Sequence, residues 1–219
     1  MTQIKADLLA ATQPWGDQSF TTPEGLIAYC ARVSNPKNQD NPDYAGLLQY
    51  CIRNKHWSVF EMSNAVVEIE APRDITRQLL RHRSFLFQEF SQRYSDEIEF
   101  TGRDFRRQDD KNRQNSIDDL TEHQQDSATM MSSMVRSTAE DYYKELIKMK
   151  VAKECARVIL PEGMTMSRLY VNGTFRSWLH YIDVRDDVGV TQWEHVLLAR
   201  AVRKVLEPAM PIMLGTPNV

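Results

Sequence analysis

The sequence predicts an α+β fold in which long helices pack on a small, largely antiparallel sheet, within a single domain spanning residues 1–219. Segments with helical spacing of apolar residues are long, whereas alternating segments typical of strands are few. The chain also lacks the regular β-α-β alternation and the G-x-G-x-x-G turn of a Rossmann sheet. With 219 residues, 42% of them hydrophobic, it is long enough to bury one substantial core.

The N-terminal part is expected to begin with a strand over residues 1–11. A helix is expected from Thr22 to about Val33, because Pro23 suits the first helical position. Residues 35–42 are expected to form a loop, and apolar residues at helical spacing predict a second helix over 43–54.

The next elements lead into a basic region. Alternation over residues 65–70 predicts a strand, which Pro72 would end. A helix is expected to begin near Arg73 and to carry Arg77 and Arg81 on the same face, since residues four apart are neighbours on a helix. Because like charges repel, we expect an anion or an acidic partner to compensate these arginines.

The C-terminal half is expected to be mostly helical. Residues 101–128 are polar and poor in large apolar residues, which indicates a surface excursion or a partly ordered loop. The elements expected after it are a long helix over 127–150, a helical continuation over 151–160 up to Pro161, a turn at 171–174, a helix over 175–185 and a last helix over 191–207 ended by Pro208.

Charge and cysteine content narrow the function. The formal net charge of −3 argues against a protein built to coat nucleic acid. Cys30, Cys51 and Cys155 are scattered, without a C-x-x-C pair or the spacing of metal ligands, which favours a reduced cytoplasmic protein with no metal site. Cys155 shares a helical face with Val158 and is expected in the core. No segment has the apolar length of a signal peptide or a membrane span, so we expect a soluble protein.

One stretch, Arg77–Ser95, interleaves arginine, glutamine and serine with leucine and phenylalanine. That composition indicates an anion site on a buried framework, although a solvated basic helix face has the same composition. The order of its residues is more specific. Arg81-His82-Arg83, seven residues and then Ser91 resembles the RHR-x7-S motif of the flavin-dependent thymidylate synthases.

Four other segments resemble this family in the same order, so that the resemblance covers roughly residues 55–195. They are His56–Glu61, similar to H-x-[ST]-x-x-E; Glu154–Pro161, similar to A-R-x-x-L-P; Asn172–Arg185, similar to a ligand-binding helix; and Thr191–His195, similar to a segment with Q-W-E. The resemblance implies conversion of dUMP to dTMP, with 5,10-methylenetetrahydrofolate as carbon donor and NADPH as reductant through FAD. It also implies a mechanism without a cysteine nucleophile, and a homotetramer whose active sites are each shared between chains.

The resemblance further implies roles for individual residues. Arg185 would be catalytic, by stabilising the anion at uracil N3. The implied dUMP contacts are Gln78, Arg81, Glu89, Phe90, Ser91, Arg93, Arg157 and Arg185. The implied FAD contacts are His56, Ser58, Glu61, Arg81, His82, Arg83, Glu89, Thr174, Arg176 and His180. Arginine suits bidentate phosphate binding, and amide, hydroxyl and carboxylate groups suit a pyrimidine or a ribose.

Two features complicate this picture. Arg176 and Arg185 are nine residues apart, about half a turn out of phase on one helix, which favours a site shared between subunits over both reaching one ligand from one chain. The chain also departs from part of the family, with Asp187–Val190 where other members have a histidine and Gln88 where many have asparagine. The flavin contact of that histidine is therefore in doubt.

Two other functions remain open from the residues. Phe85, Phe87 and Phe90 among basic residues could stack bases in a nucleic-acid-binding module. A flavoprotein of the same fold could also lack dUMP methylation. Flavin absorbance separates the first alternative from an enzyme, and dUMP-dependent oxidation of the reduced flavin separates the second.

Overall fold

The computed structural model of the protein describes residues 2–215, so Met1 of the expected first strand and residues 216–219 of the expected domain lie outside the described residues. Within that range, four strands form one antiparallel sheet in the order β1-β2-β6-β3. They are β1 (Lys5–Ala11), β2 (Asn64–Pro72), β3 (Leu86–Glu89) and β6 (Met166–Thr174). Together with the helices this confirms the predicted α+β class.

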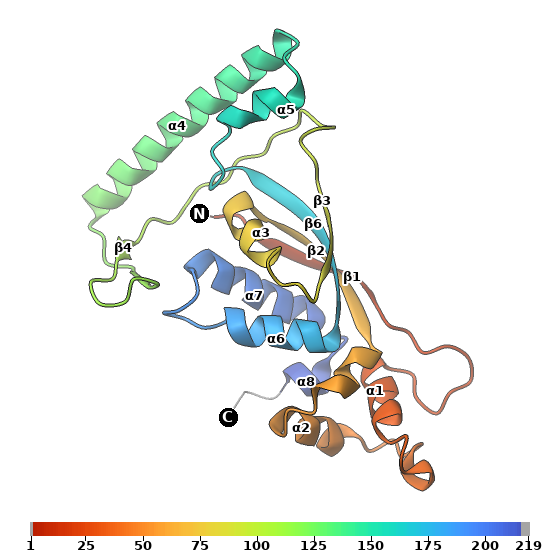
Figure 1. Cartoon of the computed structure of the whole chain (residues 1–219). Helices are drawn as coiled ribbons and strands as arrows, with labels where there is room; N and C mark the ends of the chain where they lie inside the picture. Colours follow the sequence, from red (N-terminus) through yellow and green to blue (C-terminus); the bar gives the residue numbers. More distant parts are fainter. Residues whose placement is uncertain (1, 216–219) are drawn as a thin grey trace.

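The two central strands carry the core. β2 and β6 pair along their full length, from Asn64 opposite Thr174 to Pro72 opposite Met166. Helices α3 (Arg73–Leu79), α6 (Phe175–Arg185) and α7 (Trp193–Leu206) lie on one side of this sheet (Figure 1). Trp178 of α6 is fully buried, and its indole N–H donates to the carbonyl of Ala65 at 3.2 Å. The central strands and these helices thereby form one hydrophobic core.

A second group of short elements closes one end of the sheet. It consists of α1 (Pro23–Ala31), η1 (Pro36–Asn38), α2 (Ala45–Arg53), the 3-10 turn η2 (Trp57–Met62) and α8 (Pro211–Leu214). The Thr22 hydroxyl caps α1 by accepting from the Gly25 N–H at 3.0 Å, which confirms the expected helix start. Glu24 is buried and accepts from the backbone N–H groups of Ile212 and Met213, so α8 is held against α1.

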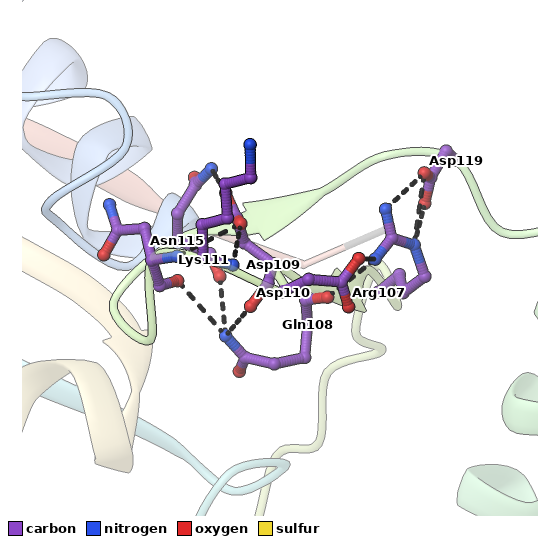
Figure 2. Close-up of polar contacts among 8 residues, drawn as sticks. Arg107, Gln108, Asp109, Asp110, Lys111, Asn115 and Asp119 are labelled. Atoms are coloured by element: carbon purple, nitrogen blue, oxygen red, sulfur yellow. Dashed lines mark hydrogen bonds and ion pairs between the residues drawn. The ribbon is translucent and has the colours of Figure 1, made fainter.

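The remaining elements project from this body (Figure 1). They are the hairpin β4 (Arg107–Gln108) and β5 (Ser116–Ile117), the long helix α4 (Glu122–Lys148), α5 (Lys153–Ala156) and the 3-10 turn η3 (Arg157–Ile159). Side-chain contacts hold the hairpin together (Figure 2). The Asp109 carboxylate accepts from the Lys111 backbone N–H and the Asn115 amide, both at 2.8 Å, and Arg107 pairs with Asp119 at 2.8 Å.

Two sequence predictions were wrong, one for a strand of the sheet and one for the helix that begins at Arg73. The expected turn at 171–174 is the end of strand β6, and Gly173 serves a close packing contact there: a Cβ atom would lie 2.3 Å from the Phe85 ring. The helix from Arg73 ends at Leu79, so Arg81 does not continue the face of Arg77. Phe85 explains the reversal, since burying its ring against Trp178, at a centroid distance of 4.4 Å, turns the chain back into β3.

The segment 151–160 was also predicted wrongly. It is divided between the four-residue helix α5 and the turn η3, so it has no continuous helical face. Cys155 is exposed and Val158 is 82% exposed, which contradicts their expected place in the core. Within residues 2–215, no helix has the length and apolar character needed to cross a membrane.

Candidate active site

The last residue of α6 meets the turn that follows α3. The Arg185 guanidinium donates through Nε to Nε2 of His82 at 2.9 Å. Burial, then the positive charge of Arg185 and then His180, lower the pKa of His82 to about 4. The imidazole is therefore neutral at pH 7 and accepts this hydrogen bond. Since no carboxylate in the described part of the chain forms an ion pair with Arg185, its positive charge is left uncompensated.

Gln78, near the end of α3, lies against the start of α7. Its Oε1 is 3.2 Å from Nδ1 of His195, and its Nε2 donates to Oε1 of Gln192 at 2.7 Å. Aromatic rings connect this pair to Arg185. Tyr181 lies 5.7 Å from the His195 ring and 5.2 Å from the His82 ring, between centroids. Gln78, His82 and Arg185, three of the residues singled out in the sequence, thus belong to one neighbourhood.

The other end of α6 holds a second group of expected residues. Arg176 forms an ion pair with Glu61 of η2. The Thr174 hydroxyl caps α6 by accepting from the Ser177 N–H at 3.2 Å, so this expected flavin contact already has a structural role. The His56 ring lies edge-on to Tyr50, at 5.7 Å between centroids. Two further expected flavin contacts, Ser58 of η2 and His180 of α6, are exposed.

Arg81 and Arg83 flank His82 in the turn between α3 and β3, and both are exposed. Neither guanidinium has a hydrogen bond or an ion pair with any residue in the range 2–215. Two unpaired guanidinium groups beside a neutral histidine are a suitable donor set for a diphosphate. The residues present therefore fit the diphosphate of a flavin dinucleotide.

A third group surrounds a cavity of about 420 Å³ between α3 and the α5–η3 segment. Its lining includes Arg73, Arg77, Gln92, Glu154, Arg157 and Glu162. Glu154 pairs with Arg93 at 3.2 Å, and no ion pair joins it to Arg157 within residues 2–215. Arg77 pairs with Glu162, the acidic partner expected for the stacked arginines.

Three other expected substrate contacts lie along β3 and the residues after it. Glu89 accepts from the Ser167 hydroxyl at 2.7 Å. Phe90 is half-buried, and it lines a second cavity of about 370 Å³. Ser91 accepts from the Arg93 backbone N–H through its hydroxyl at 3.3 Å. The expected residues thus fall into separate groups on one chain and do not form a single pocket.

Similar sequences among known proteins identify the family of the chain. The family model for the thymidylate synthase complementing protein, Thy1, matches residues 18–212. The chain belongs to this family. It is 51% identical to the flavin-dependent thymidylate synthase of Synechocystis sp. over 87% of each chain, and 44% identical to the probable flavin-dependent thymidylate synthase of Paramecium bursaria Chlorella virus 1, over 95% of this chain and 96% of that one.

Solved structures agree on the fold of the family. A UMP/dUMP methylase, PolB from Streptomyces cacaoi, superposes with a TM-score of 0.81 at 21% identity, over 98% of this chain and 94% of that chain. Of the three rings that could stack on bases, Phe85 is only 4% exposed and cannot do so, whereas Phe87 and Phe90 are half-buried.

The site includes two residues to which sequence reasoning assigned no role. Glu194 and His195 are both buried on the first turn of α7. The sequence signal was present, since both lie within the Q-W-E-containing segment and polar side chains in a buried first turn are unusual. What the sequence did not show is that this turn lies directly behind Gln78.

Proposed function

We propose that the protein is a flavin-dependent thymidylate synthase that methylates dUMP to dTMP. 5,10-Methylenetetrahydrofolate supplies the carbon, NADPH is the reductant and FAD is the cofactor. Family membership and the relatives over most of the chain support this activity. The observation that carries the chemistry is the Arg185–His82 contact, in which a cation faces a neutral imidazole and keeps its full charge.

Arg185 is the proposed catalytic residue. Methylation requires C5 of uracil to act as a nucleophile, and electron density at C5 increases when negative charge develops on the ring near N3. A fixed, uncompensated cation beside N3 stabilises that charge without reorganising during the reaction. No cysteine nucleophile is needed in this proposal, and the three thiols are not gathered at one place. Cys30 and Cys51 lie on α1 and α2, at the far end of the sheet from α5, which carries Cys155.

We assign flavin binding to the turn after α3, to η2 and the residue before it, to helix α6 and its N-cap, and to the end of β3. When bound, FAD would supply the redox chemistry that links NADPH oxidation to the new methyl group. The protein's own part is to hold the cofactor, with Arg81 and Arg83 on the diphosphate. The full proposed set is His56, Ser58, Glu61, Arg81, His82, Arg83, Glu89, Thr174, Arg176 and His180.

For dUMP, Arg93 and Arg157 are the proposed phosphate ligands, because both lie at or beside the arginine-lined cavity. Gln78, Glu89 and Ser91 offer the donors and acceptors that orient a pyrimidine and a ribose. Phe90 provides an apolar surface next to them, and Arg81 and Arg185 complete the set.

We further propose a homotetramer, acting in the cytoplasm, in which each site is shared between chains. Two observations support sharing. Arg176 and Arg185 lie at opposite ends of α6, about 14 Å apart at 1.5 Å per residue. Helix α4 also exposes a row of large apolar side chains suited to contact with another subunit: Met130, Met131, Met134, Val135 and Tyr142. The cytoplasm is supported by the three free thiols.

An anaerobic assay tests the activity directly. The purified protein is incubated with dUMP, methylenetetrahydrofolate, NADPH and FAD, and dTMP is measured by chromatography. We expect dTMP to form in proportion to the NADPH oxidised. Flavin reduction without dTMP, and without dUMP-dependent reoxidation, would favour the same-fold flavoprotein that does not methylate dUMP.

Subunit mixing tests the shared site. Arg176→Ala and Arg185→Ala proteins are each expected to be inactive, and mixed tetramers are expected to recover part of the activity because some sites receive both arginines. Mixing is verified by mass spectrometry with one isotope-labelled variant. Mixed tetramers that remain inactive would exclude sharing of these two residues between chains.

A further inference from the structure

A continuous row of hydrogen bonds joins the first turn of α7 to Gln78 of α3. His195 Nδ1 lies 3.2 Å from Gln78 Oε1, Gln78 Nε2 is 2.7 Å from Gln192 Oε1, and Gln192 Nε2 is 3.0 Å from Glu194 Oε2. The other Glu194 oxygen is 3.4 Å from Arg103 Nη1. The row therefore has a carboxylate at one end and an imidazole at the other.

The carboxylate fixes the direction of every bond in the row. The Glu194 carboxylate forms an ion pair with Arg103 and accepts from Gln192, so Gln192 presents its NH₂ group to it and turns its oxygen toward Gln78. That oxygen can only accept as well, so Gln78 donates through Nε2 and turns its own oxygen toward His195. The proton between Gln78 and His195 must then be on Nδ1. Arg103 holds the carboxylate end in place, since its Nη2 also donates to Asp74 at 2.9 Å.

The imidazole end is equally constrained. His195 is fully buried, and its Nε2 has no hydrogen-bond partner within the residues that the structure describes. Burial, then Arg185 and His82, lower the pKa of His195 to about 3, which keeps the ring neutral. A neutral ring with its proton on Nδ1 is a donor to Gln78 and to nothing else in this neighbourhood. The one hydrogen bond that His195 donates therefore orients the Gln78 amide.

We infer that His195 is a positioning residue, which acts with Glu194 through Gln192 to hold the Gln78 amide in one orientation for pyrimidine recognition. The inference rests on the proposed function, because that function makes Gln78 a dUMP contact. With both neighbours bonded, Gln78 keeps one N–H donor and one acceptor lone pair in a fixed arrangement. Such an arrangement complements the alternating carbonyl and N–H groups of a uracil edge.

Equilibrium binding of dUMP to the oxidised, FAD-loaded enzyme tests this role without turnover. Calorimetry compares wild type with His195→Leu, which removes the donor at similar volume, and with His195→Asn, whose amide N–H can replace Nδ1–H. We expect the Kd for dUMP to rise about two- to tenfold in His195→Leu, the usual effect of one net hydrogen bond, and to recover in His195→Asn. FAD content is expected to stay constant. Glu194→Gln, which removes the fixed polarity, is expected to act like His195→Leu.

A double-mutant cycle separates positioning from general stability. Adding His195→Leu to Gln78→Ala should raise the Kd no further, because the oriented group is already gone. Val202→Ala, a buried change on the same helix, should lower the melting temperature and leave the Kd unchanged. An unchanged Kd in both His195→Leu and Glu194→Gln overturns the inference while the proposed function stands. An unchanged Kd in Gln78→Ala overturns the inference and the assignment of Gln78 as a dUMP contact, while the proposed activity stands. Should His195→Leu not fold, Glu194→Gln and His195→Asn decide the question. Wild-type enzyme that binds no dUMP overturns the proposed function and the inference together.

Discussion

The two ends of helix α6 carry the same residue type in opposite electrostatic situations. At the N-terminal end, Arg176 pairs with Glu61, and their side chains are 48% and 42% exposed. At the C-terminal end, Arg185 donates to a half-buried, neutral imidazole. An ion pair cancels the charge of an arginine, whereas a neutral partner fixes its position and leaves the charge available. The C-terminal end is thus the one prepared to stabilise an anion.

Replacing Arg185 should have the largest effect. We expect Arg185→Ala to lower turnover by roughly 10²–10³, or about 2.7–4 kcal/mol, because one preorganised charge-stabilising donor is lost. FAD binding should change far less. Arg200→Ala is the matched control, since Arg200 pairs with Asp186 one residue beyond α6, outside the proposed site. Stopped-flow oxidation of the reduced flavin measures the rate, and normal turnover in Arg185→Ala would remove the distinction between the two helix ends.

The neutral histidines behind Arg185 predict an acid-sensitive fold. The folded-state pKa values of His82, about 4, and His195, about 3, lie below the usual 6.5. Between pH 6.5 and 4 the unfolded chain therefore binds protons that the folded chain does not, and stability falls as the pH falls. For buried His195 the loss over this range is at most about 3 kcal/mol, at 1.36 kcal/mol per pKa unit; half-exposed His82 contributes less.

Urea unfolding at several pH values measures this effect. The free energy of unfolding should decline less steeply below pH 6.5 in His195→Asn than in wild type. His123→Asn, which changes an exposed histidine of α4, should keep the wild-type slope. Equal slopes in His195→Asn and wild type would mean that His195 is protonated in the folded state, and the directional argument for its Nδ1 proton would then fail.

The turn after α3 also places an unpaired arginine beside a neutral histidine, and this arrangement yields a prediction about FAD binding. Because Arg83 is unpaired and His82 is neutral, we expect His82→Ala with Arg83→Ala to weaken FAD binding by about ten- to a hundredfold, as the loss of a hydrogen bond to a charged group would. The oligomer should remain folded. Arg113→Ala, at an exposed hairpin arginine, is the control. The test is flavin titration followed by fluorescence, and unchanged occupancy in the double variant would refute the assignment.

The sequence predicted local helical structure better than it predicted tertiary contacts. The helix over 175–185 was correct to the residue, because its apolar spacing and the Thr174 cap are local signals. The C-terminal end of strand β6 was missed because Asn172-Gly173 is a common turn signal. The glycine is instead required by close packing against Phe85, which lies 88 positions earlier in the sequence.

The same limit applies within the site. The segment with Gln192 and Glu194 was recognised from its sequence motif. Its hydrogen bonds to Gln78, however, join residues that are more than a hundred positions apart in the sequence. Likewise, nothing in the local pattern shows that His82 is neutral, because the pKa depends on Arg185 and on burial in the folded chain. Local motifs identify side chains, whereas charge states and partners require the tertiary structure.

The smallest effects are expected at the cysteines, and they test whether Arg185 is sufficient without a thiol. Burial raises the pKa of the Cys51 thiol and that of Cys30, so both are poor nucleophiles. Cys155 is exposed on α5, where Cys155→Ser should change stability by no more than about 0.5 kcal/mol. Cys51→Ala, at a buried site, should cost about 1 kcal/mol. These two variants and Cys30→Ala should each still form dTMP.

The measurement is dTMP formation in each folded single variant, together with mass spectrometry of enzyme quenched during turnover. A stably folded variant that forms no dTMP, and that lacks a covalent dUMP adduct seen in wild type, would identify a nucleophilic cysteine. In that case the charge on Arg185 would assist covalent catalysis and would not replace it. Retention of activity in all three variants leaves electrostatic activation at the C-terminal end of α6 as the source of C5 nucleophilicity.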